Sequence, residues 1–268
     1  MPRLVPKSLA RLWRSLIPKV TSRPPPPTAN IEYNRQLWDR YARNWDQRAF
    51  EVENKDVRPE DIDDYLQFVG DEWGRVEDVV ALVRDWIHPH VNERSHVAEI
   101  GAGGGRVAAK VADRVARLWC FDISAEMQIR ARSVLATSTN VEYVLVEGAE
   151  LPAAMGDTFD FVYSFDVFVH LDVHTMWKYV REIHRVLKDG GRALLHTTNL
   201  TSPGGWNHFA AQDAYKVEGH YFVTPELVRV LAERGGFVIV KESTPDPTNF
   251  YLNRDYLVIL EKRRHPSL

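Results

Sequence analysis

Residues 96–106 read HVAEIGAGGGR, and this stretch decides the fold. An apolar run passes through Glu99, glycines follow at Gly101, Gly103 and Gly105, and a helical pattern begins after them. Glycine is needed where the backbone takes a positive φ or lies against a ligand, because a Cβ would hold the ligand away. The helix N-terminus beyond such a turn favours a carboxylate or another negative group. The stretch therefore predicts a ligand-binding turn at the end of a strand.

The spacing of these glycines differs from that of dinucleotide-binding folds. Those folds use G-x-G-x-x-G, in which the third glycine lets helix and strand pack closely. Counted from Gly101, the pattern requires glycine where the chain has Arg106. Counted from Gly103, it requires glycine where the chain has Ala108. An NAD(P)-dependent oxidoreductase is therefore a less favoured alternative.

A second carboxylate stands at the tip of the next predicted strand. Asp122 ends strand 117–122 and follows Gly105 by 17 residues. A carboxylate there suits a bidentate bond to two ribose hydroxyls and would repel a 2′-phosphate. Alone, Asp122 would be interpreted as a loop or capping acid, and Ser124 after it as a helix N-cap. Together with the glycine turn, Asp122 predicts a ribose-binding site.

The pattern Glu-x-Gly-x-Gly-x-Gly at 99–105 resembles the first motif of class I S-adenosylmethionine (SAM) dependent methyltransferases. In that family the strand-end acid interacts with the methionine ammonium, and the glycine backbone passes under the cofactor. The resemblance implies SAM as the cofactor. The positions that it implies for SAM binding are Glu99, Gly101, Ala102, Gly103, Gly105, Asp122, Ile123, Glu147, Gly148, Ala149, Phe165 and Asp166.

The resemblance extends along the chain from about 95 to 262. Residues 146–152, VEGAELP, resemble the loop after the third strand, which faces the adenine. Many relatives carry an acid that bonds the adenine amino group at the position of Gly148, so Glu147 or a backbone carbonyl is expected to replace it here. Residues 159–166 resemble the fourth strand, which ends beside the transferred methyl group. The chain resembles small-molecule methyltransferases of the ubiquinone and menaquinone type.

Strand and helix patterns alternate through the chain, which is typical of the α/β class. The predicted strands are 96–100, 117–122, 142–146, 159–165, 192–198, 237–243 and 255–262. The predicted helices are 34–50, 76–87, 104–114, 125–136, 173–187 and 225–234. Short apolar strands separated by helices imply a mainly parallel sheet covered on both faces, and the last two strands, with no helix between them, suit an antiparallel pair. We therefore expect a Rossmann-like, doubly wound, seven-stranded sheet, mainly parallel with an antiparallel terminal hairpin strand.

Length and composition favour one domain at 30–268 behind a basic tail at 1–29. The 268 residues suffice to bury a core, and 44% hydrophobic with 26% charged residues is ordinary for a globular protein. Residues 30–92 are expected to form an N-terminal helical cap and 200–223 a lid over the acceptor. The single Cys120 cannot form an internal disulfide, which favours a reducing compartment, and no apolar run approaches the ~20 residues of a membrane span. We expect a cytoplasmic protein.

The tail and the rest of the chain differ in charge. Residues 1–29 hold six Lys and Arg and no acid, so the formal net charge of −3 leaves about −9 for the remainder. An acidic body argues against a nucleic-acid partner, because phosphates are bound mainly by Lys and Arg. Residues 1–20 resemble a short basic amphipathic helix that contacts an anionic membrane or a partner protein. A disordered tail or a transit peptide is the favoured alternative.

Two histidines are candidate catalytic bases. Methyl transfer needs mainly alignment of donor and acceptor, but a hydroxyl acceptor also benefits from a base. His170 follows the fourth strand by a few residues, at the carboxyl edge where such sheets bind ligands, although a packing role fits equally well. His196 ends the fifth strand, and a buried, hydrogen-bonded histidine is its slightly preferred alternative. Asp172 is expected to cap helix 173–187, and no spacing requires a metal.

Aromatic residues are expected to bind the acceptor. The 200–223 segment is rich in glycine, aromatic residues and histidine, which is typical of a functional lid, although an aromatic-docked surface loop is possible. Such faces with a few polar groups fit a ring-bearing or sugar-like molecule. The predicted substrate contacts are Tyr41, Trp45, Trp206, His208 and Tyr221.

The sequence thus predicts a SAM-dependent methyltransferase that acts on a small molecule or a glycan. The histidines favour transfer to oxygen over nitrogen or carbon. The main alternative is a catalytically idle SAM-binding scaffold, which the glycine at Gly148 favours.

Overall fold

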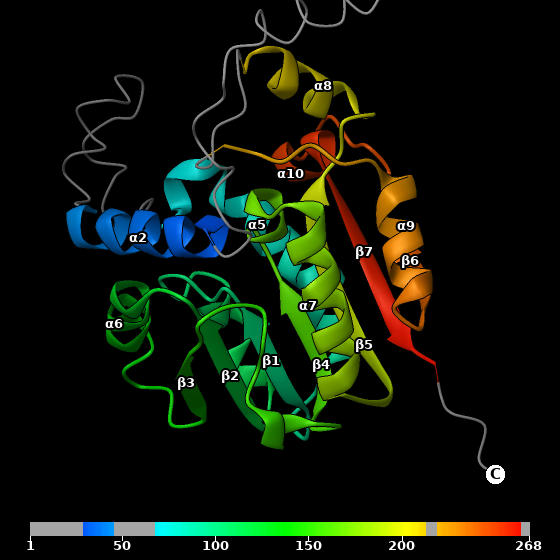
Figure 1. The fold of residues 1–268 in the computed structure, drawn as a ribbon. Helices are drawn as coiled ribbons and strands as arrows, with labels where there is room; N and C mark the ends of the chain where they lie inside the picture. The colour runs from blue at the N-terminus through cyan, green and yellow to red at the C-terminus, as the bar shows by residue number, and fades with distance from the viewer. Residues whose placement is uncertain (1–28, 46–67, 213–218, 264–268) are drawn as a thin grey trace, which may run out of the picture.

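A computed structural model describes residues 29–45, 68–212 and 219–263 (Figure 1). The basic tail predicted at 1–29, with its amphipathic helix, lies outside them except for Ala29. Within these residues, no helix is both long and apolar enough to cross a membrane.

The sheet has seven strands in the order β3-β2-β1-β4-β5-β7-β6. The strands are β1 (His96–Ile100), β2 (Arg117–Asp122), β3 (Val141–Leu145), β4 (Phe159–Ser164), β5 (Leu187–Thr198), β6 (Phe237–Glu242) and β7 (Asp255–Lys262). Strands β1 to β5 pair in parallel, whereas β7 lies antiparallel between β5 and β6. The predicted fold class, including the antiparallel terminal pair, is confirmed.

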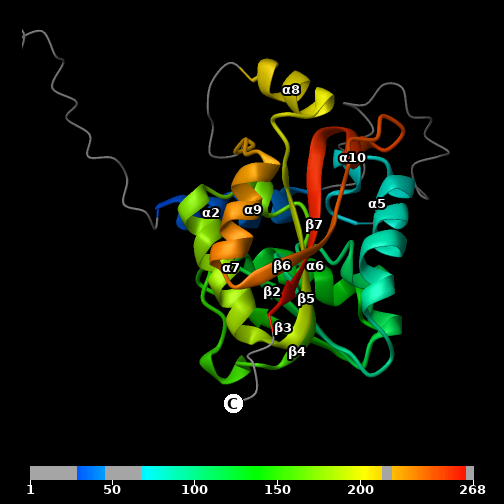
Figure 2. The ribbon, with the colours of Figure 1, turned by 90° about the vertical axis from the view of Figure 1, so that its right-hand side faces the viewer.

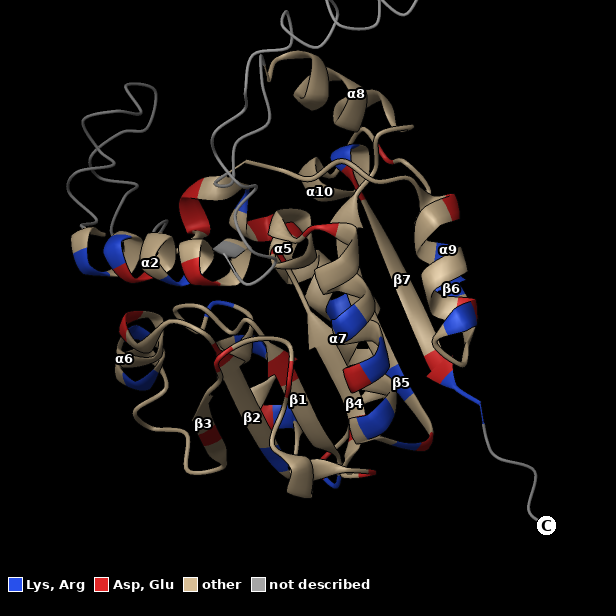
Figure 3. Ribbon diagram, viewed as in Figure 1, with Lys and Arg blue, Asp and Glu red and all other residues tan. Residues whose placement is uncertain are grey.

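Helices cover both faces of the sheet (Figure 2). They are α2 (Ala29–Asn44), α5 (Val76–Leu82), α6 (Ala125–Val134), α7 (Val173–Val186), α8 (Pro203–Ala210), α9 (Pro225–Arg234) and α10 (Phe250–Arg254). Helices α7 and α9 bury apolar side chains on one face, and α5 does so on the other. Ser124 and Asp172 cap α6 and α7 as predicted, each accepting backbone N–H bonds. Acidic and basic residues are interspersed on α2, α7 and α9 (Figure 3).

Strand β5 and the segment after the glycine turn differ from the sequence-based expectation. Strand β5 begins at Leu187 rather than 192, because a bulge with Gly190 at φ 75° extends its pairing with β4. The predicted helix 104–114 is instead two short 3-10 turns, at Ala108–Lys110 and Ala112–Arg114. Their hydrogen bonds run three residues back along the chain, as from Lys110 N–H to Val107 O.

Helix α2 lies across the carboxyl edge of the sheet. Its Asp39 accepts a hydrogen bond from Ser124 Oγ at 2.6 Å, just after β2. Its Arg35 donates to the backbone oxygen of Glu147 at 3.2 Å, just after β3. These contacts place α2 over the edge where parallel sheets bind ligands. The helix begins at Ala29, earlier than the predicted start at residue 34.

Candidate active site

Two cavities meet at the carboxyl edge of the sheet. The first, here called the turn cavity, lies against the glycine turn and measures about 990 Å³, including space open to solvent. The second, here called the side chamber, measures about 850 Å³, also including space open to solvent. Both are lined by Trp38, Trp73, Asp166 and His170. A ligand in one cavity would therefore face a ligand in the other across these four side chains.

Most of the predicted cofactor residues line the turn cavity. Those that do are Glu99, Gly101, Ala102, Gly103, Asp122, Ile123, Phe165 and Asp166. Gly105, Glu147, Gly148 and Ala149 are described but are not among its lining residues. The Glu147 side chain is exposed.

The glycines of the turn have two different uses. Gly103 has φ 54°, and a Cβ there would meet no protein atom within 4 Å, so it would project into free space beside the cavity. Gly105 has φ 88°, and a Cβ there would lie 3.3 Å from Ala131 Cα of α6. Gly103 thus leaves room for a ligand, whereas Gly105 lets the turn pack on α6. This cradle fits a cofactor that passes close to the backbone.

Glu99, at the tip of β1, is a buried carboxylate in the cavity wall. Its exposed fraction is 2%, and the Tyr163 hydroxyl donates to its Oε2 at 2.9 Å. Burial raises the pKa of Glu99 to about 8. A buried acid of this kind favours a positively charged ligand group such as an ammonium, which would restore its ionised form.

Asp122, at the tip of β2, is oriented by the backbone. Its Oδ2 accepts from Gly103 N–H at 2.7 Å, and its Oδ1 accepts from Ser124 N–H at 2.8 Å. Burial raises the pKa of Asp122 to about 6, so it is mostly ionised at neutral pH. Each carboxylate oxygen can accept a further bond, which suits two neighbouring hydroxyls. The SAM ribose and methionine ammonium therefore fit the two strand-tip acids.

The side chamber has an aromatic wall. The ring centroids of Trp38, Tyr41 and Trp73 lie 5.5–5.9 Å apart. The complete lining is Leu37, Trp38, Tyr41, Trp73, Asp166, Val169, His170, His220 and Arg254. The chamber thus combines flat apolar faces with a few ionisable groups, as in sites for ring-bearing small molecules.

His170 presents a basic nitrogen at the junction of the cavities. Its Nδ1 lies 3.2 Å from the backbone oxygen of Gly219. A carbonyl only accepts, so Nδ1 carries the proton and Nε2 of the neutral ring keeps its lone pair. Burial lowers the pKa of His170, so the ring is neutral at pH 7 and available as a base.

Asp166 lies at the same junction in the left-handed backbone region, with φ 57°. Its Oδ2 pairs with Arg106 Nη2 at 2.5 Å. Burial would raise the pKa of Asp166, but Arg106 and other positive neighbours hold it below the usual value. Arg106, which interrupts the dinucleotide pattern, also donates to Gly70 O and to the Tyr251 hydroxyl. It therefore ties the glycine turn to the tip of β4.

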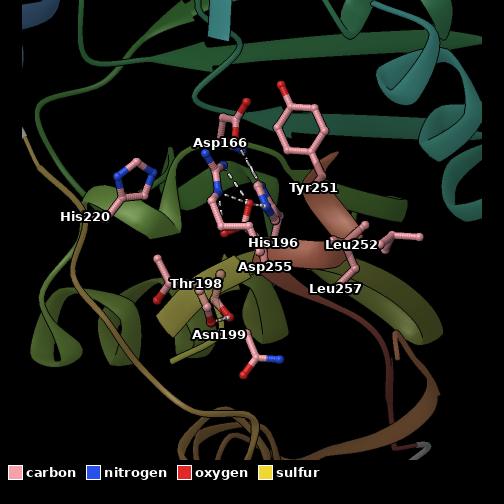
Figure 4. Close-up of polar contacts among 12 residues, drawn as sticks. Asp166, His196, Thr198, Asn199, His220, Tyr251, Leu252, Asp255 and Leu257 are labelled. Atoms are coloured by element: carbon pink, nitrogen blue, oxygen red, sulfur yellow. Dashed lines mark hydrogen bonds and ion pairs between the residues drawn. The ribbon is translucent and has the colours of Figure 1, made fainter. Parts of the chain in front are cut away.

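His196 lines neither cavity, and its side chain lies between Asp166 and Asp255 (Figure 4). Its Nδ1 accepts from Asp166 N–H at 3.0 Å, and its Nε2 lies 3.0 Å from Asp255 Oδ2. Its ring is fully buried and stacks on Phe165 with centroids 4.5 Å apart. These contacts match the buried, hydrogen-bonded alternative and hold the backbone of Asp166 in place.

Of the five predicted substrate residues, all within the described part of the chain, Tyr41 alone lines one of the two cavities. Tyr41 lines the chamber, whereas Trp45 packs against α6, where its backbone oxygen accepts from Arg130 at 3.2 Å. Trp206, on α8, is 56% exposed. His208 and Tyr221 are described but line neither cavity.

The insertion reaches the chamber through a residue that the sequence did not single out as a contact. His220 lines the chamber, and its Nδ1 lies 3.0 Å from His208 Nε2. Within the described residues, no group of three or more His, Cys, Asp and Glu side chains could hold a metal ion.

Comparisons with known proteins agree with this arrangement. Residues 98–195 match the family model described as a methyltransferase domain. A search of curated proteins gives no match.

Several solved structures have the same fold. Magnesium protoporphyrin IX methyltransferase of Synechocystis PCC 6803, with bound S-adenosylhomocysteine (SAH), is 21% identical, with 86% of this chain and 99% of that chain covered and a TM-score of 0.57. A SAM-dependent methyltransferase of Methanosarcina mazei is 18% identical, with 67% and 97% covered and a TM-score of 0.53. The cyclase SpnF is 16% identical, with 68% and 80% covered and a TM-score of 0.55. At these identities the likeness concerns the fold.

The family match begins within β1 and ends within β5, so it includes both strand-tip acids and the glycine turn. The ubiquinone and menaquinone subgroup stays a prediction, since none of these matches specifies it. The matched domain, the strand order and the turn cavity agree with one another. Residues 98–195 match a methyltransferase domain, and the sheet and the turn cavity are those expected of the class I SAM-dependent methyltransferase fold.

Proposed function

We propose that the protein transfers a methyl group from SAM to an oxygen atom of a small molecule or glycan, with His170 as the base. The main support is that the turn cavity and the side chamber meet at Asp166 and His170. In this proposal, a cofactor in one cavity and an acceptor in the other would lie on either side of a basic nitrogen.

The residues of the site have separate tasks in this proposal. Bound SAM would supply an electrophilic methyl group on its sulfonium. Glu99 would bind the ammonium, and Asp122 the ribose hydroxyls. His170 Nε2 would take the proton of the acceptor hydroxyl as the oxygen forms its bond to the methyl carbon and the sulfonium bond breaks. The imidazolium then returns the proton to solvent.

The chamber lining supports a ring-bearing acceptor. Trp38, Tyr41 and Trp73 supply aromatic surface, which binds flat or sugar-like rings. Arg254 lines the same chamber, with its guanidinium held by Asp255 at 2.6 Å. It is placed to donate to a second oxygen of the acceptor and so to align it.

The first experiment is calorimetric titration with SAM, SAH and NADH, followed by transfer of labelled methyl groups to phenols, carboxylic acids, sugars and amines. We expect the two adenosyl ligands to bind, NADH not to bind, and an oxygen acceptor to be labelled. SpnF shares this fold, so the fold alone does not fix the reaction. Binding of SAM without transfer to any acceptor would replace the proposal with an idle SAM-binding scaffold.

His170→Gln tests the base. We expect kcat to fall roughly 100-fold or more while SAH affinity stays unchanged, which is the usual contribution of a general base. The matched control is His174→Gln, which changes an exposed histidine on α7. Full activity of His170→Gln would remove His170 as the base.

The pH profile gives an independent readout of His170. Burial lowers the pKa of His170, so its neutral, active form persists below the ordinary value of about 6.5. We therefore expect the rate to decline only below about pH 6.5 and expect His170→Gln to lack this limb. An acid limb centred well above this pH would contradict the assignment.

A further inference from the structure

One polar atom beside the turn cavity has no hydrogen-bond partner. Asn34, on α2, lines the cavity and is 2% exposed. Its Nδ2 donates to Asn30 Oδ1 at 2.7 Å. Its Oδ1 is buried and accepts no hydrogen bond from the described part of the chain. A buried carbonyl oxygen left in this state is unfavourable, so a ligand that supplies a donor would be stabilised there.

The neighbours of Asn34 determine that the unused atom is the oxygen. Asp172 lies 3.2 Å from Asn30 Nδ2. Burial would raise the pKa of Asp172, but hydrogen bonds from Thr175, Asn30 and His174 hold it below the usual value. The ionised carboxylate can only accept, so Asn30 must turn its NH2 group toward it and its oxygen toward Asn34. Asn34 must in turn present its NH2 group to Asn30, which leaves its oxygen free.

The position of Asn34 along α2 indicates which part of the cofactor it meets. Ile31, one turn earlier, lies over the adenine-facing loop, since a Cβ at Gly148 would be 3.3 Å from it. Trp38, one turn later, lies beside His170 with ring centroids 5.1 Å apart. Asn34 therefore faces the adenosine half of the cavity rather than the site of methyl transfer.

The adenine amino group needs an acceptor in that half. The lining side chains near the adenine loop are mainly apolar: Ile123, Val146 and Leu151. Asp122 is placed for the ribose, and Gly148 offers no side chain. The two hydrogens of an adenine amino group would match an unused amide oxygen.

We propose that Asn34 Oδ1 accepts a hydrogen bond from the 6-amino group of the cofactor's adenine, and that Asp172 sets this preference through Asn30. The inference rests on SAM binding, which is part of the proposed function. It assigns adenine selectivity to α2, outside the matched family domain. The same series of hydrogen bonds extends to the 200–223 insertion, because Asn30 Nδ2 also donates to the Tyr221 hydroxyl at 2.9 Å.

The test compares two ligands by calorimetry: SAH and S-inosylhomocysteine, in which a carbonyl oxygen replaces the 6-amino group. Wild-type protein should bind SAH roughly tenfold more tightly, the worth of one hydrogen bond in a buried site. Asn34→Leu keeps the side-chain size but removes the acceptor, so it should lose most of this preference. The control is Gln36→Leu, an exposed position on the same helix, which should keep it.

A second variant tests the orientation without changing Asn34. Asp172→Asn keeps a good N-cap for α7, since Asn and Asp cap equally well. An amide at 172 can donate to Asn30, which lets both asparagines reverse and turns the Asn34 NH2 group toward the ligand. We expect the preference to shift toward S-inosylhomocysteine by several-fold.

The outcomes separate the inference from the proposed function. If Asn34→Leu loses the same affinity for SAH and for S-inosylhomocysteine, the adenine contact is overturned. A ribose contact or a structural role of Asn34 would give this result. An unchanged preference in Asp172→Asn would overturn the role of Asp172. If Asn34→Leu does not fold, the preference of Asp172→Asn between SAH and S-inosylhomocysteine decides whether Asn34 contacts the adenine. If wild-type protein binds neither ligand, the proposed function fails together with the inference.

Discussion

At the scale of single residues, the cofactor chemistry depends on the protonation of Glu99. Burial raises the pKa of Glu99 to about 8, so the side chain is mostly protonated at pH 7 in the absence of a ligand. An ammonium group beside it favours the carboxylate and lowers this pKa. Binding should therefore release a proton from the side chain that receives the cofactor's positive charge.

Calorimetric titration with SAH at pH 7, in buffers of different ionisation enthalpy, measures this release. We expect most of one proton to be released by the wild type and little by Glu99→Gln. Because binding releases a proton, SAH affinity should rise with pH up to about 8, the pKa of Glu99, and then level off. Binding by the wild type without proton release would show that no cation is placed beside Glu99.

Three of the predicted residues that line the turn cavity have local signals in the sequence. Glu99, Gly103 and Asp122 stand at strand tips, and their spacing shows the strand, turn and helix that place them. Trp73 and Arg254 had no such signal, because they come from a 3-10 turn and a five-residue helix. Their positions depend on which distant segments pack at the sheet edge, and this is a property of the tertiary fold.

At the scale of elements, substitutions in the glycine turn can separate an effect on SAH affinity from an effect on the free energy of unfolding. Gly103 and Gly105 both have positive φ, so alanine at either position carries about 1–2 kcal/mol of backbone strain. At Gly103 the added methyl meets no protein atom within 4 Å. At Gly105 it lies 3.3 Å from Ala131 Cα, so α6 must also shift.

We expect Gly103→Ala to lose SAH affinity by tenfold or more, with an unfolding free energy only about 1–2 kcal/mol lower. Gly105→Ala should show the larger loss of unfolding free energy, because packing on α6 adds to the strain. Urea denaturation and calorimetry on the two proteins check this. A Gly103→Ala protein with normal SAH affinity would mean that the cofactor does not pass over this residue.

The insertion shows how an element can be missed although its signal is present. Residues 200–223 were predicted as a lid loop from their composition, but part of the segment is helix α8 (Pro203–Ala210). Ser202 caps it, and Pro203 stands at its first turn, which is a common helix start. Two glycines follow this start, and glycine weakens a helical pattern. Helix α8 packs against α10, and this tertiary contact stabilises the helix here.

At the scale of the whole molecule, the turn cavity and the side chamber are lined by different parts of the chain. The glycine turn and both strand-tip acids lie within the matched domain at 98–195, as do Asp166 and His170, which line both cavities. The aromatic wall, His220 and Arg254 all lie outside that domain. The family resemblance could therefore predict the cofactor, whereas the side chamber is lined largely by segments that the resemblance does not specify.

Because the cofactor would join α2 to the sheet edge, its binding should stabilise the molecule as a whole. A ligand at 100 times its Kd stabilises the native state by about 2.7 kcal/mol. For a domain of this size, that corresponds to a rise in Tm of roughly 5–10 °C. We expect SAH to produce such a rise in a thermal melt of the wild type, and NADH to produce none.

Asp122→Ala is the matched variant for this melt. Its own Tm should be lower, because Gly103 N–H and Ser124 N–H lose their acceptor, so the comparison concerns the change in Tm on adding SAH. Loss of two charge-assisted bonds to the ribose should weaken binding by roughly 100-fold or more. The same SAH concentration should then raise Tm by no more than roughly 1–2 °C. A full shift in the variant would place the ribose away from Asp122 and would require a different path for the cofactor across the sheet edge.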